Sequence, residues 1–237
     1  MRKLIMSASA ASVALAIAAG AVAQTPESSF TAKVSPADAG TRAKPTNTTL
    51  TFGVTLNKPN TTVEFIDLTL PSTLKMSGKG LKRCSQATLE AQGPTGCPAG
   101  SKAGPAGTAH AVLSPLNTPL TFKVEPFVKD NDTLILYVAG LETLVQSPIT
   151  GEITDNGHKL RIAIPKELRQ PVPGNDASLT GLTQTFKGKV GSKYLVSSTG
   201  CKNRKHKFTG KLTFTQRADG APVPPPVSLA TNARCTK

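Results

Sequence analysis

The sequence predicts an all-β protein, an antiparallel two-sheet sandwich of immunoglobulin-like or related type with one short helical turn. Runs of alternating apolar and polar residues recur along most of the chain, and polar turn residues join several of them. Amphipathic helical patterns are nearly absent. Long interruptions near residues 78–107 and 165–177 make a closed barrel the less favoured arrangement.

The first strands are the clearest. Ser29–Val34 alternates weakly and is expected to form an edge strand. Thr48–Leu56 and Thr61–Leu70 are rich in β-branched residues and flank the polar turn Asn57–Asn60. We therefore expect these two strands to pair as an antiparallel hairpin, with Pro71 closing the second one.

Residues 78–107 interrupt the strand pattern with glycine, proline and two cysteines. Ser85 is positioned as the N-cap of the one helical turn, which ends before Gly93. Cys97 would then lie close enough to bridge back to Cys84. We interpret the segment as a disulfide-closed crossover that holds a helical turn against the sheets.

Strands resume after Gly107. Thr133–Val138 is apolar at nearly every position, so we expect a central strand covered on both faces. Asp130–Asp132 and Asp155–His158 carry turn residues and predict hairpins, and a single helical turn is expected near Lys166–Leu168. The other expected strands are Thr108–Leu113, Leu120–Phe127, Gly151–Thr154, Lys159–Ile164, Ser178–Val190, Lys193–Ser198, Lys207–Gln216 and Val227–Ala233.

Residues 1–23 have the order of a secretory signal peptide. Arg2 and Lys3 precede an apolar run over Leu4–Ala19, and small residues lead to a cleavage site before Gln24. The run is short and weakly hydrophobic for a membrane span, so a retained anchor is the disfavoured alternative. We expect a secreted protein, extracellular or cell-wall associated, with no transmembrane anchor after cleavage.

The chain that follows the signal peptide, residues 24–237, is expected to form a single β-sandwich domain. A split into two small β domains near residue 115 is the alternative.

Four cysteines in an exported chain indicate two disulfides rather than a metal site. Among the possible pairings we prefer Cys84–Cys97 and Cys201–Cys235, because each joins near neighbours inside a Gly-rich or Lys-rich segment. The last strand would also return Cys235 to the start of the preceding strand. A zinc site is the alternative, but the sequence has no close C-x-x-C pair, and we expect neither metal nor cofactor.

Catalytic motifs are missing from the sequence, which has no G-x-S-x-G, no H-E-x-x-H and no phosphate-binding loop. His110, His158 and His206 lie far apart, in a strand, a turn and a lysine run. We therefore assign no catalytic residue and expect that the protein is not an enzyme. A secreted hydrolase with an unrecognised active site is the alternative.

A basic segment is the sharpest compositional feature. The whole chain has a formal net charge of +14, and residues 177–218 hold nine Lys or Arg and no Asp or Glu. Such a cluster attracts polyanions, although a solvated hairpin tip that keeps the protein soluble is the alternative. The candidate polyanion contacts, which fall in one turn beside Cys201, are Lys202, Arg204, Lys205 and Lys207.

The expected partner is an anionic cell-wall polymer or another envelope protein. Specific nucleic-acid binding is not expected, because the chain has two Tyr and no Trp to stack on bases. The sequence thus predicts an exported, non-enzymatic β-sandwich that acts as a cell-envelope or extracellular interaction module.

Two motifs carry a resemblance. GLKRCSQATL followed by GPTGCPAGSKAGPAGTA, and SSTGCKNRKHKFTGKLTF followed by a cysteine near the end of the chain, resemble a pattern in exported β-rich proteins of high-GC actinobacteria. The resemblance implies export and a β-rich, disulfide-containing body. It transfers no catalytic or binding residue to this chain.

Overall fold

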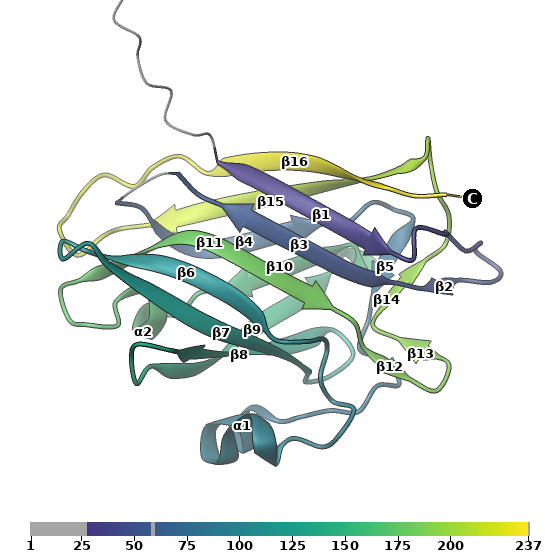
Figure 1. Ribbon diagram of the computed structural model, residues 1–237, viewed down its shortest axis with the longest axis horizontal. Helices are drawn as coiled ribbons and strands as arrows, with labels where there is room; N and C mark the ends of the chain where they lie inside the picture. Colours follow the sequence, from purple (N-terminus) through teal and green to yellow (C-terminus); the bar gives the residue numbers. More distant parts are fainter. Residues whose placement is uncertain (1–27, 58–59, 237) are drawn as a thin grey trace, which may run out of the picture.

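The computed structural model describes residues 28–57 and 60–236, so the expected signal peptide lies outside the described residues. Strands dominate the structure, and the predicted all-β class is confirmed (Figure 1). The strands are β1 (Ser29–Ser35), β2 (Thr46–Asn47), β3 (Thr49–Thr55), β4 (Thr62–Thr69), β5 (Leu74–Met76), β6 (Gly107–Ser114), β7 (Thr118–Val128), β8 (Thr133–Gly140), β9 (Gln146–Thr154), β10 (Lys159–Ala163), β11 (Asp176–Phe186), β12 (Lys189–Val190), β13 (Lys193–Tyr194), β14 (Val196–Ser198), β15 (Lys205–Thr215) and β16 (Val227–Arg234). The helical segments are α1 (Gln86–Gln92), η1 (Gly93–Gly96), η2 (Asp155–Gly157) and α2 (Lys166–Arg169).

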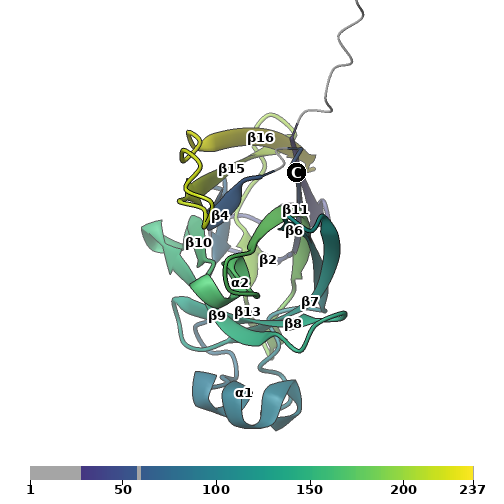
Figure 2. The ribbon, with the colours of Figure 1, turned by 90° about the vertical axis from the view of Figure 1, so that its left-hand side faces the viewer.

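Eleven strands form one antiparallel sheet in the order β1-β3-β11-β6-β7-β8-β9-β10-β4-β15-β16. The sheet curls until its two edge strands, β1 and β16, lie side by side (Figures 1 and 2). Beyond these strands, the Thr236 amide donates to the Ala37 carbonyl at 2.9 Å. The architecture is therefore a rolled, nearly barrel-like sheet rather than the expected pair of separate sheets.

Two features explain this difference from the expected sandwich. Register shifts leave one extra residue on β11, at Thr180, and one on β4, at Glu64, and such bulges bend a strand and increase its twist. The long interruption at residues 78–107 does not open the roll, because it leaves the sheet after β5 and returns to it at β6.

The predicted hairpin of Thr48–Leu56 with Thr61–Leu70 is wrong. β3 pairs with β1 and β11, whereas β4 pairs with β10 and β15 on the opposite side of the roll. The connection near Asn60 is an arch, so Phe52 and Ile66 face each other across the core. Turn residues mark where a chain reverses, but they do not decide whether the two strands pair or pack face to face.

Both hairpins predicted from turn residues in the second half are confirmed, since β7 pairs with β8 and β9 pairs with β10. The turn near Lys166–Leu168 is also confirmed, as α2. The expected strand Ser178–Val190 is split into β11 and the short β12.

The strand β8 is buried on both faces, as its apolar run predicts. Leu134 and Leu136 belong to the core inside the roll, while Ile135 and Tyr137 form a second cluster with Cys84 and Leu89. This second cluster lies under α1, on the outside of the roll (Figure 2). The expected disulfide-closed segment that holds a helical turn against a sheet is therefore present.

The cap of α1 follows the prediction. The Thr88 amide donates to the Ser85 hydroxyl oxygen at 3.0 Å, and the helix gives way to η1 at Gly93. Ser at this position satisfies a helix amide that has no partner within the helix.

The antiparallel order places the connections between strands at two ends. A small sheet of β2, β14 and β5 covers one end and buries Leu74, Met76 and Val196. The other end carries α2 and the connections β3–β4, β6–β7, β8–β9 and β15–β16 (Figure 1).

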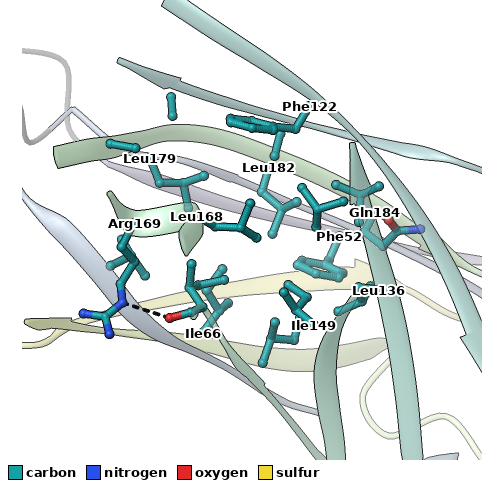
Figure 3. A pocket seen from close by; sticks show the side chains of 18 residues that line it. Phe52, Ile66, Phe122, Leu136, Ile149, Leu168, Arg169, Leu179, Leu182 and Gln184 are labelled. Atoms are coloured by element: carbon teal, nitrogen blue, oxygen red, sulfur yellow. Dashed lines mark hydrogen bonds between the residues drawn. The ribbon is translucent and has the colours of Figure 1, made fainter. Parts of the chain in front are cut away.

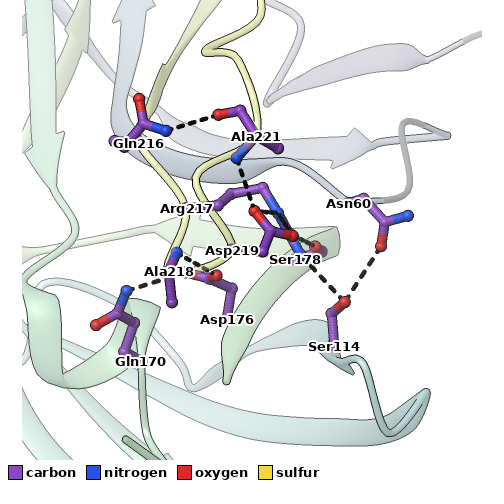
Figure 4. A network of polar contacts seen from close by, with 10 residues as sticks. All are labelled: Asn60, Ser114, Gln170, Asp176, Ser178, Gln216, Arg217, Ala218, Asp219 and Ala221. Atoms are coloured by element: carbon purple, nitrogen blue, oxygen red, sulfur yellow. Dashed lines mark hydrogen bonds and ion pairs between the residues drawn. The ribbon is translucent and has the colours of Figure 1, made fainter. Parts of the chain in front are cut away.

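A buried arginine anchors the β15–β16 connection at this second end (Figure 4). The Arg217 guanidinium pairs with Asp219 at 3.1 Å and donates to the hydroxyls of Ser114 at 3.1 Å and Ser178 at 3.4 Å. Asp176 accepts the Ala218 amide at 2.8 Å. The connection is thus tied to the end of β6 and the beginning of β11.

Both predicted disulfides are confirmed. Cys84–Cys97 and Cys201–Cys235 have Cα separations of 5.3 and 5.8 Å. The first closes the segment that contains α1. The second joins the turn before β15 to the end of β16.

Removing the disulfides should destabilise the chain in an order set by loop length. In the loop-entropy model, Cys84→Ser with Cys97→Ser costs about 3 kcal/mol and Cys201→Ser with Cys235→Ser costs about 4 kcal/mol, because the second bridge spans 34 residues and the first 13. Urea unfolding of both double variants measures the free energies. The opposite order would contradict the loop-entropy account.

Replacing the buried arginine should be costly. Arg217→Met leaves two serine hydroxyls and one carboxylate without their donor, which should lower the free energy of unfolding by roughly 1–3 kcal/mol. Arg234→Met, at an exposed position, is the matched control and should change it by less than about 0.5 kcal/mol. Urea unfolding compares the two variants, and equal losses would argue against a structural role for Arg217.

Candidate functional site

The predicted basic cluster is built on a tight turn. Asn203 and Arg204 have φ angles of 53° and 57°, and the Lys205 amide donates to the Lys202 carbonyl at 3.1 Å. Positive φ at both central residues is the signature of a type I′ turn, which suits Asn203. The Cys235 amide donates to the Arg204 carbonyl at 3.1 Å, so the last strand supports this turn.

Strand alternation then directs the lysines outward. Along β15, Lys205, Lys207 and Lys211 are exposed, while His206 and Phe208 are buried inside the roll. The four predicted contacts therefore lie together at the start of this strand. We define the basic face as Lys202, Arg204, Lys205, Lys207, Lys211 and Arg234.

Sequence reasoning missed Arg234, which is the direct cross-strand partner of Lys205. Side chains that are directly opposite in an antiparallel pair lie on the same face, with Cβ atoms about 5 Å apart. Arg234 precedes Cys235 in the sequence, and Cys201 precedes the predicted contact Lys202. The predicted Cys201–Cys235 bridge was therefore the one signal from which the position of Arg234 in this cluster could have been inferred.

Within the described residues, no carboxylate lies within 4.0 Å of the cationic groups of the basic face. Asp67 is the cross-strand neighbour of Lys211, but Arg161 donates two hydrogen bonds to it at 2.8 and 2.9 Å. These hydrogen bonds hold the pKa of Asp67 below its ordinary value, and Lys159 lies 3.6 Å from it. The nearest acid is therefore neutralised by other cations.

Not every cation of the basic segment belongs to this surface. Arg217 is buried, because its guanidinium is used to anchor the β15–β16 connection. In the segment 78–107, Lys102 forms an ion pair with Glu125 at 2.7 Å, and Arg83 donates to Asn131 at 3.0 Å.

A surface hollow of about 580 Å³ adjoins the turn. Arg204 and Arg234 line it together with the Cys201–Cys235 bridge. Thr236, also in its wall, donates to the Asp38 carboxylate at 2.6 Å. The hollow is thus a concave, arginine-lined part of the basic face with one acid beside it.

The three histidines remain apart. His110 is exposed on β6, and the Nδ1 of His158 is buried without a hydrogen-bond partner among the described residues. His206 is 1 % exposed, and its Nδ1 lies 3.0 Å from the Thr73 hydroxyl. Across residues 28–57 and 60–236, no histidine is hydrogen-bonded to a carboxylate, and no group of three or more His, Cys, Asp or Glu is placed to hold a metal ion.

An internal cavity of about 80 Å³, which the sequence did not predict, lies between the facing strands (Figure 3). Its wall is almost entirely apolar and includes Ala109 and Ala111 of β6 and Ala177 of β11. Small side chains at these inward positions leave room that larger ones would fill. Unfilled space of this size costs roughly 2 kcal/mol.

Two polar side chains reach the cavity. Gln184 is 1 % exposed, and its amide nitrogen donates to the carbonyls of Thr185 at 3.0 Å and Pro105 at 3.2 Å. Among the described residues, its Oε1 atom has no hydrogen-bond partner. Arg169 of α2 lines the opposite end of the cavity (Figure 3).

The chain matches no protein-family model, no curated protein and no solved structure. No helix within residues 28–57 and 60–236 has both the length and the apolar character needed to cross a membrane.

The stability of the fold should decrease at mildly acidic pH because of His206. Burial lowers the pKa of its ring below the ordinary 6.5, so the folded chain keeps it neutral. Below about pH 6.5 the unfolded chain binds a proton that the folded chain does not, and stability falls by at most about 1.4 kcal/mol per pH unit. Urea unfolding between pH 7.5 and pH 5.5, in roughly unit steps, measures this slope.

His206→Gln should remove most of this pH dependence, whatever its effect on stability at neutral pH. His110→Gln, at an exposed position, is the control and should keep the slope of the parent chain. An unchanged slope in His206→Gln would assign the effect to other groups.

Proposed function

We propose that the protein is an exported, non-enzymatic interaction module that binds an anionic polymer of the cell wall through its basic face. One observation carries the proposal. The outward positions of β15 and its partner β16 present Lys205, Lys207, Lys211 and Arg234, and no carboxylate of the described residues pairs with them.

The shape of the basic face favours a linear polyanion. Lys205 and Lys211 are six residues apart on one strand, a distance of about 20 Å at roughly 3.3 Å per residue. The turn before β15 adds Arg204 and Lys202 to this row of cations. A row of this kind suits a chain of regularly repeated anionic groups better than one compact ligand.

The chemistry around the row supports binding by charge. The outward neighbours on the two strands are small or polar, among them Thr209, Ser228 and Asn232. No aromatic side chain stands between the cations to stack on bases or on sugar rings. Attraction then comes from ion pairing, which salt weakens.

Export is supported by two disulfides in one chain, since such bridges persist mainly outside the reducing cytosol. The signal-peptide pattern and the resemblance to exported actinobacterial proteins point the same way.

Retention on purified cell wall tests the proposal. The exported chain should be retained at about 0.05 M salt and released at about 0.5 M, since ion pairs with a polyanion weaken steeply with ionic strength. Lys205→Gln, Lys207→Gln and Arg234→Gln combined should lower the salt needed for release. The released fraction is measured by sedimentation of the wall material.

The control removes the same charge elsewhere. Lys79→Gln, Lys82→Gln and Lys187→Gln combined lie outside the basic face and should elute like the parent chain. The proposal would be refuted by retention that does not change with salt concentration or by no retention at all. An equal decrease of retention in both triple variants would also refute it. A parallel assay with anionic vesicles shows whether the polymer or a lipid surface is preferred.

A further inference from the structure

The internal cavity reaches one particular end of the roll. Leu168 and Arg169 of α2 belong to its wall, so this four-residue helix covers the cavity where the chain passes from β10 to β11. Figure 3 shows Leu168 directed toward the other lining side chains and Arg169 beside it.

The same end is apolar on its surface. Within the described residues, all the large apolar side chains that are exposed lie on connections at this end, and they are Leu116, Leu141, Leu144, Val172 and Val223. Leu144 is fully exposed, and with Val172 and Pro171 it lines a surface hollow of about 430 Å³ beside α2. An apolar molecule would therefore be attracted to the surface that adjoins the covered cavity.

Arg169 supplies a charge at this place. Its Nε donates to the Ile164 carbonyl at 2.9 Å, which leaves the two terminal nitrogens of the guanidinium as further donors. No carboxylate within residues 28–57 and 60–236 lies within 4.0 Å of it. A half-buried guanidinium with unused donors is suited to bind a carboxylate through two hydrogen bonds.

We propose that this cavity binds a small monocarboxylate with a short unbranched alkyl tail. The tail lies among the apolar side chains inside the roll, next to Ala111 and Ala177, and the carboxylate pairs with Arg169 at the α2 end. The reverse orientation is unfavourable, because the amide nitrogen of Gln184 at the other end already donates to the carbonyls of Pro105 and Thr185 and leaves no donor for an anion.

The size of the cavity sets the tail length. An apolar cavity of about 150 Å³ holds benzene, so about 80 Å³ holds a smaller hydrocarbon group unless α2 is displaced. Short tails, as in propanoate and butanoate, should therefore bind better per added methylene than hexanoate or octanoate. This site is separate from the basic face and does not depend on the proposed function.

Titration with butanoate and with 1-butanol, followed by methyl NMR of the exported chain, tests the proposal. Both compounds should shift the methyl signals of lining residues such as Ile149 and Leu182. Butanoate should bind about tenfold more weakly to Arg169→Gln, because a charged hydrogen-bonded pair is lost, while 1-butanol should bind to this variant with unchanged affinity. Lys166→Gln, an exposed charge on the same helix, is the control and should bind both like the parent.

Filling the cavity with a larger side chain distinguishes binding inside the cavity from general adsorption to the protein surface. Ala111→Leu should abolish the shifts caused by both compounds, and Ala111→Val is the milder variant if the larger side chain prevents folding. Retained binding in the filled variant that folds, equal butanoate binding in Arg169→Gln, or absence of shifts at the lining methyl groups would each overturn the proposal.

Discussion

The structure depends on one constraint, which is that a single antiparallel sheet must bury its apolar face against itself. The chain meets it by crossing from β3 directly to β4, on the opposite side of the roll, instead of pairing these neighbours. Phe52 and Ile66 then face each other across the interior. Phe30 of the edge strand β1 packs against Gly210 of β15, with its ring about 3.5 Å from the position that a Cβ at residue 210 would take.

One face of each strand is buried in the interior of the roll. The residues on the outer face are not constrained by this core, so their chemical character differs from strand to strand. Around β8 it is apolar, and the disulfide-closed segment with α1 covers Ile135 and Tyr137. Around β15 nothing among the described residues covers the exposed lysines, and the outward positions carry lysine and threonine. The same alternation thus produces a second small core at one place and a charged surface at another.

The interior is not uniformly filled. Inward positions on β6 carry alanine at Ala109 and Ala111 where the facing strands carry larger side chains, and the resulting space ends at Arg169. The basic face and this cavity use different parts of the roll, since Lys205 and Arg234 lie near the chain's C-terminal end and α2 lies at the opposite end of the strands (Figure 1). A polymer on one and a small molecule in the other would not compete for the same residues.

The sequence by itself determined most of the long strand segments, the helical turn capped by Ser85 and both disulfide pairs. These features depend on residues that are close in the chain, such as a period of two, a capping hydroxyl or cysteines in one short segment. Four of the cations on the basic face were predicted for the same reason. The tertiary structure alone decided that β3 and β4 pack face to face, that the sheet rolls nearly closed, and that Arg234 joins Lys205. It also decided that Arg217 is buried and that alanines from two strands leave a cavity, because these outcomes depend on the packing of residues that are distant in the chain.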